Sequence, residues 1–301
     1  MSSGQAIAPA KVILSGEHFV VHGARAIAGA INLYLKLKVE EGTKDIIYSN
    51  GKTIHADYTI EKVKEITGLS KVKIQVKSSI PKSAGLGSSA SFHVAAIIAS
   101  YKLAGITPPL ERVFDESMEL EKHVHKNPSG IDVWTVLNGG ILMFKRGEMN
   151  FPISSKIDRI LLIDSGQRRN TGILVSKVGR LKENEPEKFG DLIKMADYVS
   201  LSMKGALENG DVEKAKALFK INQALLEMIN VSTPKISSIL ERLQEEGISA
   251  KITGAGGGGY LIGLPVKSVD GLKTKEVKLG VPGAYEINFK NSKGEQEGNV
   301  R

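Results

Sequence analysis

The chain contains 301 residues, of which 41% are hydrophobic and 25% are charged. These values are typical of a soluble globular protein with room for one large or two ordinary domains. No apolar run reaches membrane-spanning length and no basic-then-apolar leader opens the chain, so we expect a cytoplasmic protein with no membrane partner. The absence of cysteine excludes disulfides and thiolate metal sites, which leaves oxygen atoms as the ligands of any metal ion.

The formal net charge is +8, and two classes of anionic partner would suit it. One is nucleic acid, which basic proteins bind through its phosphates. The other is a small anionic substrate such as ATP, which a basic surface attracts. The lysines are dispersed and only 5% of the residues are aromatic, which gives little for bases to stack on. The charge alone does not choose between the two.

The N-terminal stretch predicts two strands joined by a polar bend. Residues 11–14 form an apolar run that begins with Lys11, and Gly16, Glu17 and His18 follow it. Leucine and valine then alternate with polar residues over 33–39, the period of a half-buried strand. Taken alone, Glu17 and His18 fit a salt bridge in a turn as well as they fit a functional site.

A glycine-rich loop occupies residues 81–90, with the sequence Pro-Lys-Ser-Ala-Gly-Leu-Gly-Ser-Ser-Ala. Alternation over 72–76 predicts a strand before it, and apolar residues spaced by three and four over 90–101 predict a buried helix after it. A helix N-terminus offers free N–H groups, and glycines let the backbone approach a phosphate closely. The common P-loop would end in Gly-Lys-Ser/Thr, but this chain has Ser88 and Ser89 there. A glycine turn with a serine N-cap is the alternative.

A third polar stretch runs from Glu121 to Asp132. Because Pro128 cannot continue a helix, Glu121 should lie in a final helical turn and Asp132 should follow a tight turn. By itself this stretch would be an ordinary turn with a surface carboxylate.

The patterns in the second half of the chain mainly indicate strands and packing helices. An apolar run at 161–164 predicts a buried strand, and three helices should follow, the first over 188–208 and the next two capped by Asp211 and Ser232. Four consecutive glycines at 256–259 lie between apolar strands. Ordering them costs much conformational entropy, which indicates that a ligand or a closely approaching backbone requires glycine here. Alternation over 284–289 predicts a closing strand, and Asn50-Gly51 predicts a hairpin turn.

These stretches resemble the motifs of the GHMP kinases, the family named after galactokinase, homoserine kinase, mevalonate kinase and phosphomevalonate kinase. Residues 81–90 match every fixed position of Pro-x-x-x-Gly-Leu-Gly-Ser-Ser-Ala, and residues 251–259 match Lys-x-Thr-Gly-Ala-Gly-Gly-Gly-Gly. Residues 9–23 match the mevalonate-kinase form of the first motif and depart from it only at Ala10. Residues 121–132 are similar to Glu-x-x-x-His-x-Asn-Pro-Ser-Gly-x-Asp at every fixed position.

The resemblance implies an α+β fold of two domains. Residues 1–150 would form a domain like the second domain of ribosomal protein S5, and residues 151–301 a ferredoxin-like domain. The cofactors would be ATP and Mg²⁺, and the reaction would phosphorylate mevalonate to 5-phosphomevalonate. The oligomeric state is not determined by the sequence, and a homodimer is one expectation.

The resemblance also assigns roles to residues. Asp132 would accept the hydroxyl proton and Lys11 would orient it, while Ser89 and Glu121 would bind Mg²⁺. Glu17, His18 and Thr171 would lie on the acceptor side, although Thr171 fits a helix N-cap equally well. The residues expected to hold ATP form the loop itself: Lys82, Ser83, Ala84, Gly85, Leu86, Gly87, Ser88, Ser89 and Ala90.

Two alternatives are weighed against this prediction. The first is a GHMP relative with another acceptor, such as a phosphomevalonate or heptose kinase or the related decarboxylase. The second is an S5-like nucleic-acid-binding protein with no activity. The joint presence of Lys11, Ser89, Glu121 and Asp132 disfavours the second, because a binding module has no use for such a set, and we therefore expect no nucleic-acid partner.

Overall fold

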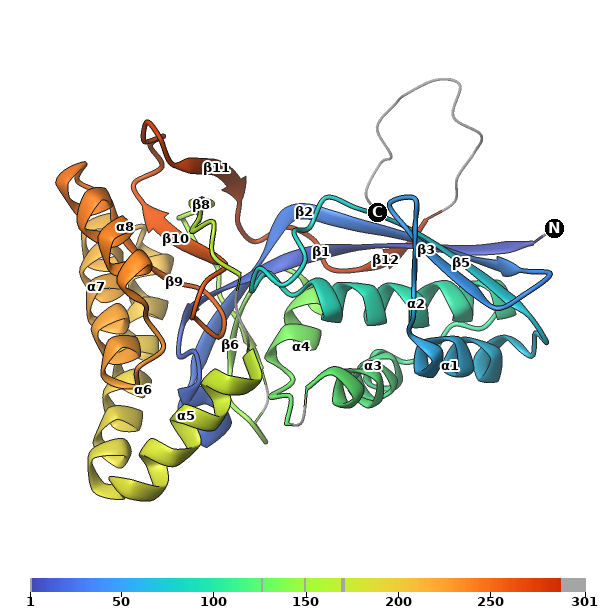
Figure 1. The fold of residues 1–301 in the computed structure, drawn as a ribbon, viewed down its shortest axis with the longest axis horizontal. Coiled ribbons are helices and arrows are strands. Elements are labelled where there is room, and N and C mark those ends of the chain that lie inside the picture. The colour runs from blue at the N-terminus through green and yellow to red at the C-terminus, as the bar shows by residue number, and fades with distance from the viewer. Residues whose placement is uncertain (1, 126, 149, 169–170, 288–301) are drawn as a thin grey trace.

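The computed structural model describes residues 2–125, 127–148, 150–168 and 171–287. Within these residues the strands form two sheets, one of eight strands and one of four. The first sheet has the order β12-β1-β2-β5-β3-β4, with β6 paired to β2 and β7 paired to β6. The second has the order β11-β8-β10-β9. Figure 1 shows α1 to α4 lying along one side of the first sheet, while α6, α7 and α8 stand at the opposite end of the molecule beside the second sheet.

Long strands β1 (Ser3–Ser15) and β2 (Ala26–Glu41) form the centre of the first sheet. They pair antiparallel from Ser3↔Glu40 to Ser15↔Ile27. Leucines and valine at the predicted positions 33–39 are buried while their neighbours are more exposed, as expected for a half-buried strand. Strand β5 (Val72–Ser78) extends the sheet. Strands β3 (Ile46–Ser49) and β4 (Lys52–Ile54) are joined at Asn50-Gly51, which confirms the predicted hairpin.

The helices of the first half cover the sheet with an apolar layer. Helix α2 (Ser88–Ala104) is buried along most of its length and packs against β1 and β2. Around it lie α1 (Asp57–Thr67), α3 (Leu110–Val124) and the short α4 (Ile131–Asn138). Helix α3 ends at Val124, so Glu121 lies in its last turn as predicted. Asp132 lies in the first turn of α4, a helix that the sequence did not predict.

The second sheet consists of β8 (Arg159–Asp164), β9 (Ser249–Ile252), β10 (Tyr260–Leu264) and β11 (Lys273–Lys278), all antiparallel. Its helices are α5 (Thr171–Asn184), α6 (Pro186–Asn209), α7 (Val212–Met228) and α8 (Pro234–Glu245). The sequence predicted three helices here and missed α5. In the described part of the chain, no helix is both long and apolar enough to cross a membrane.

Of the two predicted N-cap residues, Asp211 is confirmed and Ser232 is wrong. Asp211 caps α7 by accepting a hydrogen bond from the amide of Lys214 at 2.9 Å. Ser232 does not cap α8, because Thr233 accepts the bond from the amide of Ile236 instead. Pro234 occupies the first helical position, which makes the residue directly before it the N-cap.

The two halves of the chain are not separated strictly in sequence. Strand β7 (Phe151–Pro152) still pairs with β6 (Ile141–Phe144) of the first sheet. Near the other end of the chain, β12 (Tyr285–Glu286) returns to pair with Ala6 and Ile7 of β1. The predicted closing strand is therefore shorter than residues 284–289, of which the last two lie outside the described residues. The two-domain α+β fold is confirmed, and the boundary at residue 150 stays a prediction.

Candidate active site

The glycine-rich loop connects β5 to α2 and is fastened to β1. The Lys11 amide donates to the Leu86 carbonyl at 3.1 Å, and the Ser91 hydroxyl donates to the Pro9 carbonyl at 2.7 Å. Gly87 is the N-cap of α2, with a φ of 73° and no side-chain cap. The alternative of a serine N-cap is therefore wrong, because a residue with this left-handed backbone precedes both serines and favours glycine.

The loop presents one part of its surface and buries the rest. Lys82 and Ser83 are exposed, and Gly87, Ser88 and Ser89 are partly exposed. The other four residues predicted to hold ATP are buried: Ala84, Gly85, Leu86 and Ala90. A ligand at this loop would meet the first turn of α2, whose amides and dipole favour anions.

The glycine run between β9 and β10 belongs to the second domain and packs against the glycine-rich loop of residues 81–90. The Tyr260 amide donates to the Ala84 carbonyl at 3.1 Å, and the Gly259 amide donates to Gln167 at 2.8 Å. A Cβ on Gly259 would lie 2.6 Å from the Ala84 oxygen. Glycine is required here because no side chain fits between the two backbones.

The structure brings together the two predicted catalytic residues. The Lys11 ammonium lies 2.9 Å from Oδ1 of Asp132, and the lysine side chain is only 2% exposed whereas that of the aspartate is 35% exposed. Lys11 also packs under the loop, because a Cβ on Gly87 would lie 2.8 Å from its Cγ. Asp132 stands in the first turn of α4, where the helix dipole stabilises a carboxylate. An accessible carboxylate thus lies beside a buried cation at the edge of the loop.

The two predicted metal ligands are also neighbours. The Ser89 hydroxyl donates to Oε1 of Glu121 at 2.6 Å, and Nδ1 of His93 lies 2.7 Å from the same oxygen. Burial alone would raise the pKa of Glu121, but the hydrogen bond and charge of His93, the Ser89 hydroxyl and the charge of His125 together hold this pKa below its ordinary value. Glu121 is therefore an ionised carboxylate in a buried position.

These groups fit Mg²⁺. The ion prefers hard oxygen donors and keeps several water ligands, so it needs only one or two carboxylates from a protein. Ser89 and Glu121 supply a hydroxyl and an ionised carboxylate on neighbouring helices. Among the residues that the structure describes, no three His, Asp or Glu side chains cluster as a metal cage.

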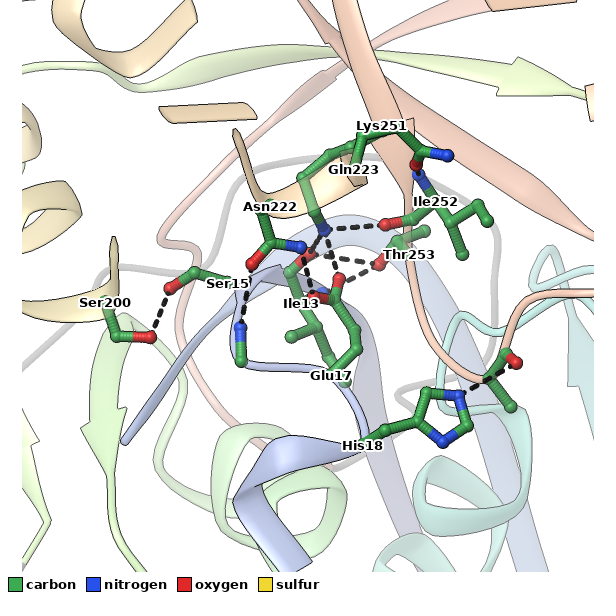
Figure 2. A network of polar contacts seen from close by, with 12 residues as sticks. Ile13, Ser15, Glu17, His18, Ser200, Asn222, Gln223, Lys251, Ile252 and Thr253 are labelled. Atoms are coloured by element: carbon green, nitrogen blue, oxygen red, sulfur yellow. Dashed lines mark hydrogen bonds and ion pairs between the residues drawn. The ribbon is translucent and has the colours of Figure 1, made fainter. Parts of the chain in front are cut away.

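Glu17 is placed differently from the prediction. Its side chain is 1% exposed and its Oε1 pairs with the ammonium of Lys251, while Oε2 accepts from Asn222 at 3.0 Å. Figure 2 shows this network, in which the Glu17 carboxylate points at residues of the second domain. The role predicted for Glu17 as a direct substrate contact is thus corrected, because both oxygens are bonded inside the protein.

His18 lies against the segment between β9 and β10. It begins the short helix η1 (Phe19–His22) as its N-cap, with a φ of 61°, and its Nε2 lies 3.0 Å from the carbonyl of Ala255 in the glycine run. The ring is partly exposed. Thr171 opens α5, but its side chain lies outside the described residues, as do Arg169 and Asn170.

Sequence reasoning missed His93, Asn222 and Lys251. His93 and Asn222 are buried polar residues on the core faces of α2 and α7. A polar residue on a core face was the available signal, since buried polar groups need partners. Lys251 was noted only as the first position of a motif. Burial lowers its pKa, the Glu17 carboxylate opposes that effect, and the charge of Lys11 adds to it, so the net shift is downward.

Comparison with known proteins agrees with this geometry. The model of the GHMP kinase N-terminal domain matches residues 53–140 and that of the GHMP kinase C-terminal domain matches residues 203–274. The chain is 34% identical to the mevalonate kinase of Archaeoglobus fulgidus over 86% of this chain and 91% of the relative. It is 32% identical to that of Aeropyrum pernix over 94% and 93% of the two chains.

Solved structures give the same result. The mevalonate kinase of L. major in complex with R-mevalonate is similar with a TM-score of 0.75 and 27% identity, over 88% of each chain. The mevalonate kinase of Methanococcus jannaschii is similar with a TM-score of 0.76 and 25% identity, over 91% of this chain and 98% of that one. Because these relatives are more than 30% identical over most of both chains and the solved mevalonate kinases share the fold, the chain belongs to the mevalonate kinases of the GHMP kinase family.

Proposed function

We propose that this enzyme transfers the γ-phosphoryl group of ATP to the primary hydroxyl of mevalonate, which gives 5-phosphomevalonate and ADP. The observation that carries the proposal is the Lys11–Asp132 pair, which lies against the glycine loop at the start of α2. Phosphoryl transfer depends on positioning and on charge stabilisation more than on covalent help from the protein. This site offers both.

The loop would hold the phosphates. The amides of the first turn of α2 and the partly exposed Gly87, Ser88 and Ser89 face an anion from the positive end of the helix. The exposed Lys82 would add a positive charge beside them. The Lys11 side chain packs against Gly87 on the inner side of the loop. It would supply the positive charge that a lysine within the motif supplies in the common P-loop.

Asp132 would act as the base. As the hydroxyl oxygen of mevalonate bonds to the γ-phosphorus, the bond from phosphorus to the bridging oxygen of ADP breaks, and the hydroxyl proton passes to the carboxylate of Asp132. Lys11 fixes that carboxylate by its 2.9 Å contact and offsets negative charge on the moving phosphoryl group. Ser89 and Glu121 would hold Mg²⁺, which neutralises phosphate charge when bound.

The acceptor side is the less defined part of the site. His18 and Thr171 stay predicted mevalonate contacts, and the relatives named mevalonate kinase favour mevalonate over phosphomevalonate or a sugar. The GHMP matches favour a kinase over an S5-like nucleic-acid-binding protein. A homodimer and a cytoplasmic location also stay predictions.

The acceptor prediction is tested by product analysis. With ATP and Mg²⁺, the enzyme is expected to convert mevalonate to a product whose ³¹P NMR signal couples to the protons of the terminal methylene carbon. Phosphomevalonate and galactose serve as control acceptors and should give only background release of ADP. A product phosphorylated on the tertiary hydroxyl, or turnover with a sugar alone, would contradict the assignment of the acceptor.

The metal prediction is tested by titrating Mg²⁺ at fixed ATP. Glu121→Gln and Ser89→Ala are each expected to raise the half-saturating concentration about tenfold or more, because each removes an oxygen donor from an ion with few protein ligands. Glu116→Gln is the matched control, since Glu116 is a buried carboxylate on the same helix that is bonded to Tyr101 instead. Equal half-saturation in all three variants and wild type would count against this metal site.

A further inference from the structure

We propose that the buried pair of Glu17 and Lys251 is a positioning element: it clamps β1 to the second domain at Ile13 and so holds Lys11 at Asp132. The inference rests on the proposed function and adds two residues to it, neither of which touches substrate. It replaces the substrate-binding role predicted for Glu17.

The outer edge of β1, defined here as the backbone groups of Pro9, Lys11 and Ile13, faces away from β2. Alternate residues of a strand direct their N–H and C=O groups to the same edge, and β2 pairs with β1 on the opposite edge. The glycine loop and α2 bind this outer edge at Pro9 and Lys11. The second domain binds it at Ile13.

Both backbone groups of Ile13 are held by the second domain. Its amide donates to Oγ1 of Thr253 at 2.8 Å, and its carbonyl accepts from the ammonium of Lys251 at 3.2 Å. Figure 2 shows the lysine reaching over Ile13 toward Glu17. Because Ile13 lies two residues after Lys11, a shift of Ile13 along the chain direction would move the Lys11 side chain with it.

The same clamp acts on Asp132 through packing. The side chain of Ile13 belongs to a small apolar cluster that includes Ile131 and Phe144, with Trp134 packed against it. Ile131 directly precedes Asp132 on α4. The strand that carries Lys11 and the helix that carries Asp132 therefore both pack into the cluster that contains the clamped residue.

Charge explains why the clamp needs Glu17. Lys251 is 0% exposed, and a buried ammonium is costly unless it is paired and hydrogen-bonded. Its ammonium has the carbonyls of Ile13 and Ile252 and the carboxylate of Glu17 as acceptors. Glu17 is in turn oriented by Asn222, whose Oδ1 accepts from the Gly16 amide at 3.2 Å.

The test compares three variants: Glu17→Gln, Lys251→Met and the double variant with both changes. Each single change leaves an unpaired buried group and should lower the melting temperature, whereas the double change removes both charges and should recover most of that loss. The turnover number should fall about 10²-fold in all three variants. Lys251→Met removes the ammonium that donates to the Ile13 carbonyl, and Glu17→Gln removes the carboxylate that holds this ammonium in place. A low turnover number that persists after the melting temperature recovers separates positioning from simple stability.

The control is another ion pair that joins the same two domains. Arg25 donates to Asp197 of α6 at 2.5 Å, and neither side chain contacts the outer edge of β1. Arg25→Met should leave the turnover number unchanged. The KM for mevalonate separates a positioning role of Glu17 from a direct contact with the substrate. A direct contact would raise the KM in Glu17→Gln and not in Lys251→Met, whereas a positioning role leaves the KM similar in both variants.

Two results would overturn the inference. One is a double variant that recovers both stability and turnover. The other is a crystal structure of the double variant in which Ile13 and the 2.9 Å contact of Lys11 with Asp132 are unmoved. If the wild-type protein does not phosphorylate mevalonate, the proposed function fails, and the crystal structure still decides whether the pair positions Lys11.

Discussion

Replacing Asp132 by asparagine is expected to lower the turnover number about 10²–10⁴-fold, the range typical for loss of a general base. The amide keeps the size of the carboxylate but cannot accept the proton of the mevalonate hydroxyl. ATP binding should change little, because the glycine loop is built from other residues. Steady-state kinetics with mevalonate, together with a nucleotide-binding titration, measures both quantities.

The control for this variant is Asp115→Asn on the exposed face of α3, which should keep wild-type turnover. Lys11→Met is the companion variant, because it removes the cation 2.9 Å from Asp132 and should also slow turnover. If Asp132→Asn retained a rate near wild type, the aspartate would only orient the hydroxyl and the assignment of the base would be wrong.

Gly259→Ala is expected to disable the phosphate loop. The backbone at this position has a φ of +82°, and the new Cβ would lie 2.6 Å from the Ala84 carbonyl oxygen. Because the obstacle is backbone, the loop itself has to move, and a displacement near 1 Å at a phosphoryl-transfer site costs about 10²-fold in rate. We expect a raised KM for ATP together with a lowered turnover number.

A matched glycine is available in α6. A Cβ on Gly190 would meet no heavy atom within 4 Å, so Gly190→Ala should leave kinetics unchanged and stabilise the helix by about 0.5–1 kcal/mol. Gly259→Ala with wild-type kinetics would mean that the glycine run does not support the loop. Thermal melting of both variants separates a local shift of the loop from general unfolding.

The residues that sequence analysis located well are those in short motifs. Lys11 and Asp132, and likewise Ser89 and Glu121, were predicted to act together and lie within hydrogen-bonding distance. The strands and helices around them were predicted because their apolar periods are regular over many residues. These pairs were predicted through the resemblance of their motifs to those of the GHMP kinases and not from local geometry, because Glu17 lies in such a motif and its partners were not predicted.

What the sequence left undetermined depends on contacts between distant segments. Glu17 meets Asn222 and Lys251 across more than 200 positions of chain, and no local pattern reports which carboxylate will meet which ammonium. The buried His93 gave no periodic signal, because one histidine does not change the apolar period of α2. Helix α5 was missed because its first residues follow the polar run Arg-Arg-Asn, which indicates a loop as readily as a helix start.

The return of β12 to β1 has a consequence for synthesis of the chain. On the edge of β1 that faces away from β2, Ala6 and Ile7 pair with Glu286 and Tyr285. A ribosome making about 5–20 residues per second therefore leaves this edge uncovered for tens of seconds before its partner emerges. An open strand edge is a template for pairing with other chains. The first sheet is therefore completed only after residues 285–286 have been made, and until then this edge of β1 is open to pairing with another chain.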